Sequence, residues 1–103
     1  MNEFFVELGA RWVAAAKRRG VDIEVPALDA RVALELLELA RTAAHTRERR
    51  FAPLSSYLAG IAAERVRQAR PDFDDGAAAA FIREVWKELE AEAGPAGDPA
   101  TGR

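Results

Sequence analysis

Residues 36–63 read LLELARTAAHTRERRFAPLSSYLAGIAA. This stretch is the strongest indication of the fold class, and the flanking segments are interpreted in relation to it. Its first half is rich in leucine and alanine, which favour helices because they lose little side-chain entropy there. Three arginines follow between residues 47 and 50. Pro53 then stands where helices often begin, because a first-turn residue needs no N–H group. The pattern predicts two helices joined by a short basic turn.

The helix predicted over residues 29–46 is expected to be the central one. Its apolar side chains cover about half of the helical circumference, so they must contact neighbours on more than one side. These side chains are Leu28, Val32, Ala33, Leu36, Leu37, Leu39, Ala40, Ala43 and Ala44. The remaining strip is expected to face solvent and consists of Arg31, Glu35, Glu38 and Thr42.

The helix predicted over residues 53–70 carries a glycine among alanines. The side chains that we expect in the core share one face: Leu54, Tyr57, Leu58 and Ile61. Glycine in a helix interior costs roughly 1 kcal/mol relative to alanine. We therefore expect Gly60 to lie at a close backbone approach to the helix over residues 29–46, where an added methyl group would overpack the contact.

A further helix is predicted over residues 3–19. Asn2 is placed to cap its first turn, and Gly20 is a typical residue just after a helix end. Its apolar stripe consists of Phe4, Phe5, Leu8, Trp12, Val13 and Ala16. Residues 21–28 are expected to be extended and to pack along the bundle, because Pro26 disfavours a helix just before it.

The last helix is predicted to end at residue 93, with Asp72 or Asp74 as its cap. Its buried stripe is expected to hold Ala78, Phe81, Ile82, Val85, Trp86 and Leu89. Both tryptophans, Trp12 and Trp86, are expected to be largely buried. The four helices predict an all-α fold, a compact up-down antiparallel bundle forming one domain over residues 1–93. Residues 94–103 lack apolar periodicity and are expected to be disordered.

Composition narrows the range of functions. The 103 residues include fifteen basic and seventeen acidic side chains, and a net charge of -2 does not favour nucleic-acid binding. There is no cysteine, and neither a phosphate-binding loop nor a catalytic motif is visible. We therefore expect a non-enzymatic protein without a metal or cofactor. No signal peptide or membrane span is visible, so a cytoplasmic location is expected.

One basic cluster is the candidate functional region, and it consists of Arg41, His45, Arg47, Arg49 and Arg50. Arginines beside the N–H groups of a helix start can bind an anion. The alternative is that the arginines are neutralised by Glu48, Glu88, Glu90 and Glu92. The candidate surface for a protein partner or an anion comprises Arg41, His45, Arg49, Pro53, Ser55, Ser56 and Tyr57.

His45 is the only histidine of the chain. Without a cysteine, a second histidine or a placed nucleophile, it is a weak candidate for a metal ligand or a catalytic base. We expect a structural role, with Glu48 as its hydrogen-bond partner three residues later.

The same stretch resembles a small bacterial domain family of unknown function. The family pattern joins a leucine-rich helix, an Ala-Arg-x-x-Ala-His segment, a basic turn and a small-residue helix. It is carried here by Leu36, Leu37, Leu39, Ala40, Arg41, Ala44, His45, Glu48, Arg49, Ala52, Pro53, Leu54, Ser55, Ser56, Tyr57, Leu58, Gly60 and Ala62. Arg50 and Phe51 depart from it, because proline or alanine is typical there.

Members of that family stand alone or follow a nucleotidyltransferase that attaches guanylate to molybdopterin. The resemblance therefore implies an accessory role near molybdenum-cofactor maturation, and it assigns no catalytic residue. Our first hypothesis is a non-catalytic module that binds a protein partner, such as the molybdenum cofactor guanylyltransferase, or a second copy of itself. The second is a helical domain that binds a small anionic ligand. The third, a DNA-binding regulator, is disfavoured by the balanced charge, and no membrane partner is expected.

Overall fold

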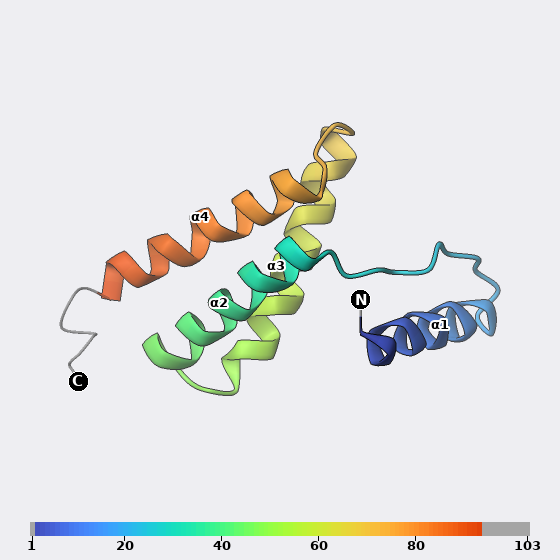
Figure 1. Cartoon of the computed structure of the whole chain (residues 1–103), viewed down its shortest axis with the longest axis horizontal. Coiled ribbons are helices and arrows are strands. Elements are labelled where there is room, and N and C mark those ends of the chain that lie inside the picture. Colours follow the sequence, from blue (N-terminus) through green and yellow to red (C-terminus); the bar gives the residue numbers. More distant parts are fainter. Residues whose placement is uncertain (1, 94–103) are drawn as a thin grey trace. The chain divides into compact units, whose positions relative to one another are not determined.

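The computed structural model of the chain describes residues 2–93. Its helices are α1 (Glu3–Lys17), α2 (Ala30–Thr46), α3 (Phe51–Ala69) and α4 (Asp75–Ala93), with no strand in the described range (Figure 1). The predicted all-α, four-helix fold class is therefore confirmed. The chain divides into two compact units, Met1–Ala30 and Arg31–Arg103, so the single domain over residues 1–93 stays a prediction. The predicted tail, residues 94–103, lies outside the described residues.

The first unit consists of α1 and the connector that follows it. The Asn2 side chain accepts a 2.7 Å hydrogen bond from the amide of Phe4, which confirms the predicted cap. Gly20 has a φ of +79°, the left-handed conformation that lets the chain turn after the helix. An added Cβ at Gly9 would lie 2.8 Å from the carbonyl oxygen of Pro26. The connector therefore runs directly against α1, and Gly9 permits this close approach.

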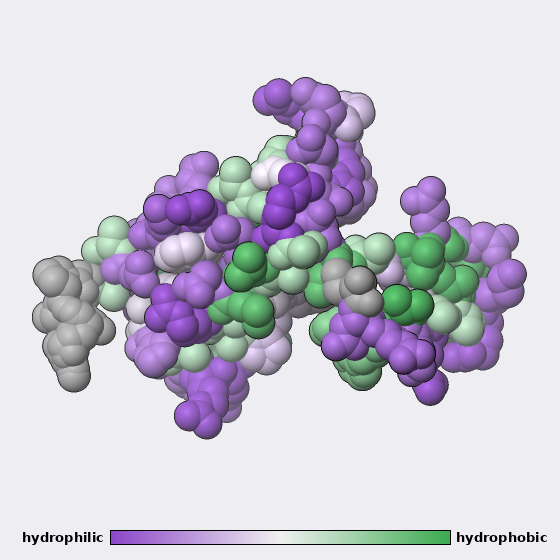
Figure 2. All heavy atoms as spheres, in the orientation of Figure 1, coloured by the Kyte–Doolittle hydropathy of each residue, from purple (hydrophilic) through white to green (hydrophobic). Residues whose placement is uncertain are grey.

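The apolar stripe of α1 is only partly covered. Trp12 is 57% exposed, so the prediction that it is largely buried is wrong. Residues 26–28 leave a hollow of about 200 Å³ beside Trp12, Phe5 and Leu8 instead of packing onto these side chains. Figure 2 shows hydrophobic residues at the surface of this unit, in green.

The second unit consists of α2, α3 and α4. Glu35 of α2 contacts Trp86 of α4, and Arg41 contacts Glu90, so these two helices run in the same direction. In Figure 1 α3 runs the opposite way and crosses α2 obliquely, which agrees with the expected up-down order within this unit. The most buried side chains are Leu39, Thr42, Ala43, Ala78, Ala79 and Ile82.

The α3 helix packs with its small side chains rather than its large ones. Its half-buried face includes Ala52, Ser55, Ala59, Ala62, Ala63 and Val66. Leu54 is 65% exposed and Leu58 66%, and Tyr57 is also exposed, so the prediction that these three enter the core is wrong. Ile61 is half-buried. Small side chains let helix backbones approach closely, whereas a face of leucine and tyrosine would hold α3 farther away.

Gly60 does not lie at a helix contact. A Cβ built on it would meet no other group within 4 Å, and the residue is exposed. The predicted close approach to α2 is therefore wrong. Because Ala59 and Ala62 form the packed side of α3, Gly60 is left on a side of the helix that faces solvent.

The polar strip of α2 is buried in part instead of facing solvent. Thr42 is only 2% exposed, and Glu35 and Glu38 are half-buried. In contrast, Leu37, which helical periodicity assigns to the apolar arc, is exposed. The predicted solvated strip is therefore wrong for these three polar residues. Their burial is tolerated because each polar group has a hydrogen-bond partner, as described below.

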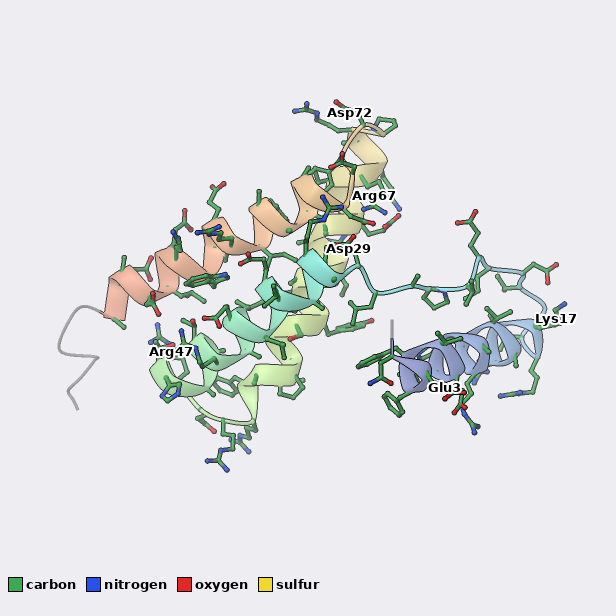
Figure 3. All side chains as sticks on the ribbon, in the orientation of Figure 1. Glu3, Lys17, Asp29, Arg47, Arg67 and Asp72 are labelled. Atoms are coloured by element: carbon green, nitrogen blue, oxygen red, sulfur yellow. The ribbon has the colours of Figure 1, made fainter. Side chains whose placement is uncertain are left out.

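The turn between α3 and α4 is held by charged side chains. Arg67, labelled on α3 in Figure 3, lies near this turn. It forms a 3.3 Å ion pair with Asp75 and donates a hydrogen bond to the carbonyl oxygen of Phe73. The Asp74 side chain accepts a 2.9 Å hydrogen bond from the amide of Ala77, so Asp74 is the cap of α4. Asp72 pairs with a neighbouring arginine instead, at 3.7 Å.

Candidate partner-binding surface

The start of α3 offers fewer amide donors than its sequence indicates. The helix begins at Phe51, two residues before the predicted start at Pro53. The amides of Phe51 and Ala52 already bond to the carbonyl oxygens of Glu48 and Arg49. Ser55 and Ser56 then lie beyond the first turn, where amides bond to carbonyl oxygens four residues earlier. Their amides are therefore used within the helix and do not point at a ligand.

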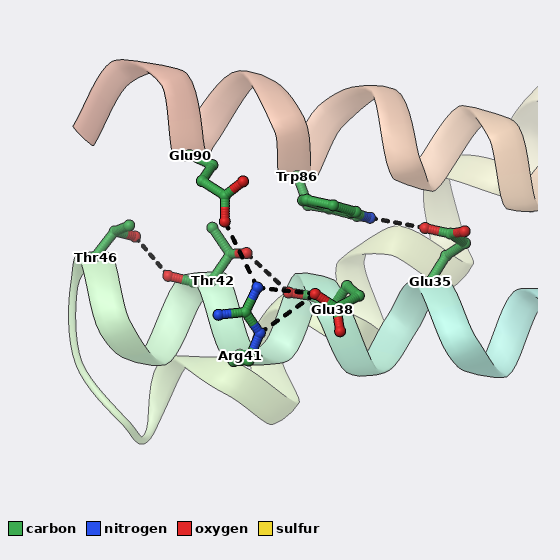
Figure 4. A network of polar contacts seen from close by, with 7 residues as sticks. All are labelled: Glu35, Glu38, Arg41, Thr42, Thr46, Trp86 and Glu90. Atoms are coloured by element: carbon green, nitrogen blue, oxygen red, sulfur yellow. Dashed lines mark hydrogen bonds and ion pairs between the residues drawn. The ribbon is translucent and has the colours of Figure 1, made fainter. Parts of the chain in front are cut away.

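Arg41 is engaged by two carboxylates. Its guanidinium lies 2.8 Å from the Glu38 carboxylate and 3.5 Å from that of Glu90 (Figure 4). The hydrogen bond and the charge of Glu38, with a smaller contribution from Glu90, raise the pKa of Arg41 above its ordinary value. The expected neutralisation by Glu90 is confirmed, and Arg41 links α2 to α4.

The other basic residues of the cluster extend into solvent. Arg50 pairs with Glu48 at 2.7 Å, which confirms that Glu48 neutralises an arginine. Arg47 donates to the carbonyl oxygen of Thr46. His45 and Arg49 are exposed, and their side chains form no hydrogen bond or ion pair with a described residue, so the expected contact between His45 and Glu48 is not formed. His45 and Arg49 are thus available to an external partner.

The α3 residues of the candidate surface point in different directions. Pro53 and Tyr57 are exposed, whereas Ser55 and Ser56 are half-buried. The Ser56 hydroxyl donates to the carbonyl oxygen of Ala52 at 3.3 Å. Ser55 lines a groove toward α4. Of the exposed residues of the candidate surface, Arg41 is engaged by Glu38 and Glu90. The other four are His45, Arg49, Pro53 and Tyr57, and we refer to them as the corner surface.

A groove between α3 and α4 did not emerge from the sequence. This α3–α4 groove has a volume of about 250 Å³ and is lined by Leu39, Ser55, Leu58, Ala59, Ala62, Phe81, Ile82, Val85 and Leu89. Its signal in the sequence is the run of small residues at positions 55, 59 and 62, which share one helical face. That face is the one that packs, so the large side chains beside it remain uncovered.

Other site types receive no support from the described residues. Between residues 2 and 93, no three histidine, aspartate or glutamate side chains are grouped so that they could hold a metal ion. None of the described helices combines the length and the hydropathy that crossing a lipid bilayer requires.

Comparison with known proteins gives one match. A protein-family model described as "Domain of unknown function (DUF6457)" matches residues 6–95. The matched range includes the corner surface and the α3–α4 groove. No curated protein and no solved structure matches the chain.

Proposed function

The chain belongs to the DUF6457 family, a domain of unknown function, and we propose that it is a non-catalytic helical module that binds a protein partner. The observation that carries this proposal is the exposure of two large side chains on α3, 65% for Leu54 and 73% for Tyr57. Neighbouring exposed apolar side chains on a folded domain mark sites of protein interaction. Tyrosine is also among the residues that contribute most to binding energy.

The corner surface also carries two exposed basic residues, His45 and Arg49. Their side chains have no partner among the described residues, and they precede Leu54 in the chain by nine and five residues. An apolar centre with a basic rim fits a partner that presents apolar side chains and carboxylates. Charge at the rim accelerates association, and burial of the apolar centre supplies most of the affinity.

The resemblance of residues 36–63 to an appendage of a guanylyltransferase suggests which partner to test first. That partner is the molybdenum cofactor guanylyltransferase. The anion-binding alternative has less support, because Arg41 is engaged by Glu38 and Glu90 and the amides near Ser55 are used within α3. The DNA-binding alternative has less support because the chain carries a net charge of -2.

Pull-down with the purified guanylyltransferase tests the proposal. Tyr57→Ala combined with Arg49→Gln is expected to reduce binding at least tenfold, because it removes an aromatic contact and a rim charge. Leu34→Ala is the matched control, since Leu34 is an equally uncovered leucine on α2, 63% exposed, and should bind like the unmodified chain. All three chains should melt at similar temperatures.

Two results would count against the proposal. Undiminished binding by the double variant would exclude the corner surface as the contact. No binding of the unmodified chain to the guanylyltransferase would exclude that partner. In the second case, the Arg41→Gln, His45→Gln, Arg49→Gln variant can be tested by thermal shift with phosphate and GTP, which addresses the anion alternative directly.

A further inference from the structure

We propose that the α3–α4 groove is a self-association surface, filled by the α3 helix of a second copy of this chain. The groove is lined by none of the four residues of the corner surface. Leu54 enters both arguments, so the tests below change Leu58, Arg65, Glu88 and Glu92, which the proposed function does not use.

The α3–α4 groove is apolar and open to water. Leu39 and Ile82 lie in it and are themselves buried, with 5% and 3% exposure. On the α3 side, Ser55, Ala59 and Ala62 are small, which leaves room for an inserted side chain. Leu58 and Val85 line the groove and are still exposed to water. Burying a leucine side chain removes apolar surface from water, so filling the groove is favourable.

The same face carries a side chain of the right kind to fill the groove. Leu54 and Leu58 lie one turn apart on α3, directly beside the small residues of the groove. A two-fold axis requires that a surface fit a copy of itself, with each projection opposite a hollow of the partner. Leucines next to an apolar groove of about 250 Å³ meet this requirement, because each copy can insert its α3 leucines into the groove of the other.

The charges at the two edges of the groove are opposite. On α4, Glu88 and Glu92 follow Val85 by three and seven residues and therefore lie on its side of the helix. On α3, Arg65 follows Leu58 by seven residues and continues the leucine row. These three side chains are exposed, and none forms an ion pair with a described residue.

In a two-fold dimer, the basic α3 edge and the acidic α4 edge of the groove form two favourable contacts. The α3 edge of each copy then lies against the α4 edge of the other, so Arg65 approaches the Glu88 and Glu92 carboxylates of the second copy. The chain's net charge of only -2 opposes such association weakly. A second copy therefore both buries the apolar groove and places opposite charges against its edges.

Analytical ultracentrifugation of the full chain tests the apolar contact. The unmodified chain is expected to be a dimer, and Leu58→Glu is expected to be a monomer, because a carboxylate would enter the groove of the partner. Leu34→Glu is the control and should remain dimeric, since Leu34 does not line the groove. A monomeric unmodified chain, or a dimeric Leu58→Glu, would overturn the proposal.

A charge exchange tests the contact without placing a charge in the groove. Arg65→Glu alone, and Glu88→Arg with Glu92→Arg alone, should each be monomeric, because like charges then meet at both edges. Mixed in equal amounts, the two variants should form a heterodimer, because each edge again meets an opposite charge. A mixture that stays monomeric, or variants that dimerise by themselves, would contradict the inference.

The two proposals can fail separately. A dimeric Leu58→Glu chain that captures the guanylyltransferase would retain the proposed function and reject the groove as the self-association surface. A dimeric unmodified chain that captures no guanylyltransferase would retain the self-association and reject that partner.

Discussion

The indole Nε1 of Trp86 donates a 2.8 Å hydrogen bond to the carboxylate of Glu35, joining α4 to α2 across 51 residues of sequence. Six residues farther along α2 and four residues farther along α4, Arg41 reaches Glu90. These contacts form a line between the two helices (Figure 4). Because each contact pairs a specific atom with a specific partner, the line sets the register of α2 against α4.

Glu35→Ala is predicted to destabilise the chain by about 1–3 kcal/mol, because it leaves the half-buried indole N–H without a charged acceptor. Glu35→Gln should cost less, since its amide oxygen still accepts the hydrogen bond. Urea denaturation measures both values. Glu84→Ala is the control, because Glu84 is exposed and without a partner among the described residues. Equal losses for Glu35→Ala and Glu84→Ala would show that the hydrogen bond contributes nothing.

Arg41→Gln is predicted to cost only about 0–1 kcal/mol, since ion pairs of exposed side chains contribute little. The Arg41 side chain is 51% exposed, and its partners Glu38 and Glu90 are similarly accessible. The raised pKa of Arg41 keeps its guanidinium charged across the usual pH range, so raising the pH should not reproduce the effect of the substitution. Thermal melting at low and high salt is the measurement, and the small loss should shrink as salt screens the pair. A large, salt-independent loss would indicate a packing role instead.

Gly60→Ala is predicted to stabilise the chain by up to about 1 kcal/mol, the difference in helix propensity between the two residues. The added methyl group enters open space, because apart from the adjacent residues and backbone of α3 itself no group lies within 4 Å of the Cβ position. The midpoint of chemical denaturation should rise accordingly. A lower midpoint would mean that Gly60 is covered in solution.

Gly9→Ala is predicted to have the opposite effect. Its Cβ would lie 2.8 Å from the Pro26 carbonyl oxygen, a backbone atom that cannot rotate away. Overpacking of this kind costs typically about 1–3 kcal/mol. Hydrogen exchange should therefore accelerate at the amides of residues 21–28, while exchange in α2–α4 stays unchanged. Gly60→Ala is the matched control, because it makes the same substitution in a helix where space is available.

Asp74→Ala is predicted to destabilise the chain by about 0.5–2 kcal/mol, the usual loss on removing a helix cap. Its carboxylate accepts a 2.9 Å hydrogen bond from the Ala77 amide at the start of α4. Asp72→Ala should have little effect, since its pair with Arg70 is long, 3.7 Å, and exposed. The midpoints of chemical denaturation compare the stabilities of the two variants. A larger loss of stability for Asp72→Ala than for Asp74→Ala would mean that Asp72 caps α4.

The candidate site was predictable from the sequence only in part. The basic cluster at residues 41–50 is visible in the sequence, and its neutralisation by Glu48, Glu88, Glu90 and Glu92 is one of the two interpretations that the sequence leaves open. Among the described residues, ion pairs to the cluster form with Glu48 and Glu90 of these four. That His45 and Arg49 stay exposed, whereas Arg41 is engaged, depends on where α4 lies. The α3–α4 groove is formed by two helices together, so no single helical pattern indicates it.

The sequence by itself determined the four helices and most of their ends. Caps and stops such as Asn2 and Gly20 act within a few residues, so their effect can be read locally. Only the tertiary structure decided which face of each helix is covered. Periodicity shows which side chains share a face of a helix, but which face is buried depends on the helices that pack against it. The small face of α3 is buried instead of its leucines, because small side chains let the helices approach closely. Glu35 and Thr42 are buried in part or fully because their polar groups have hydrogen-bond partners.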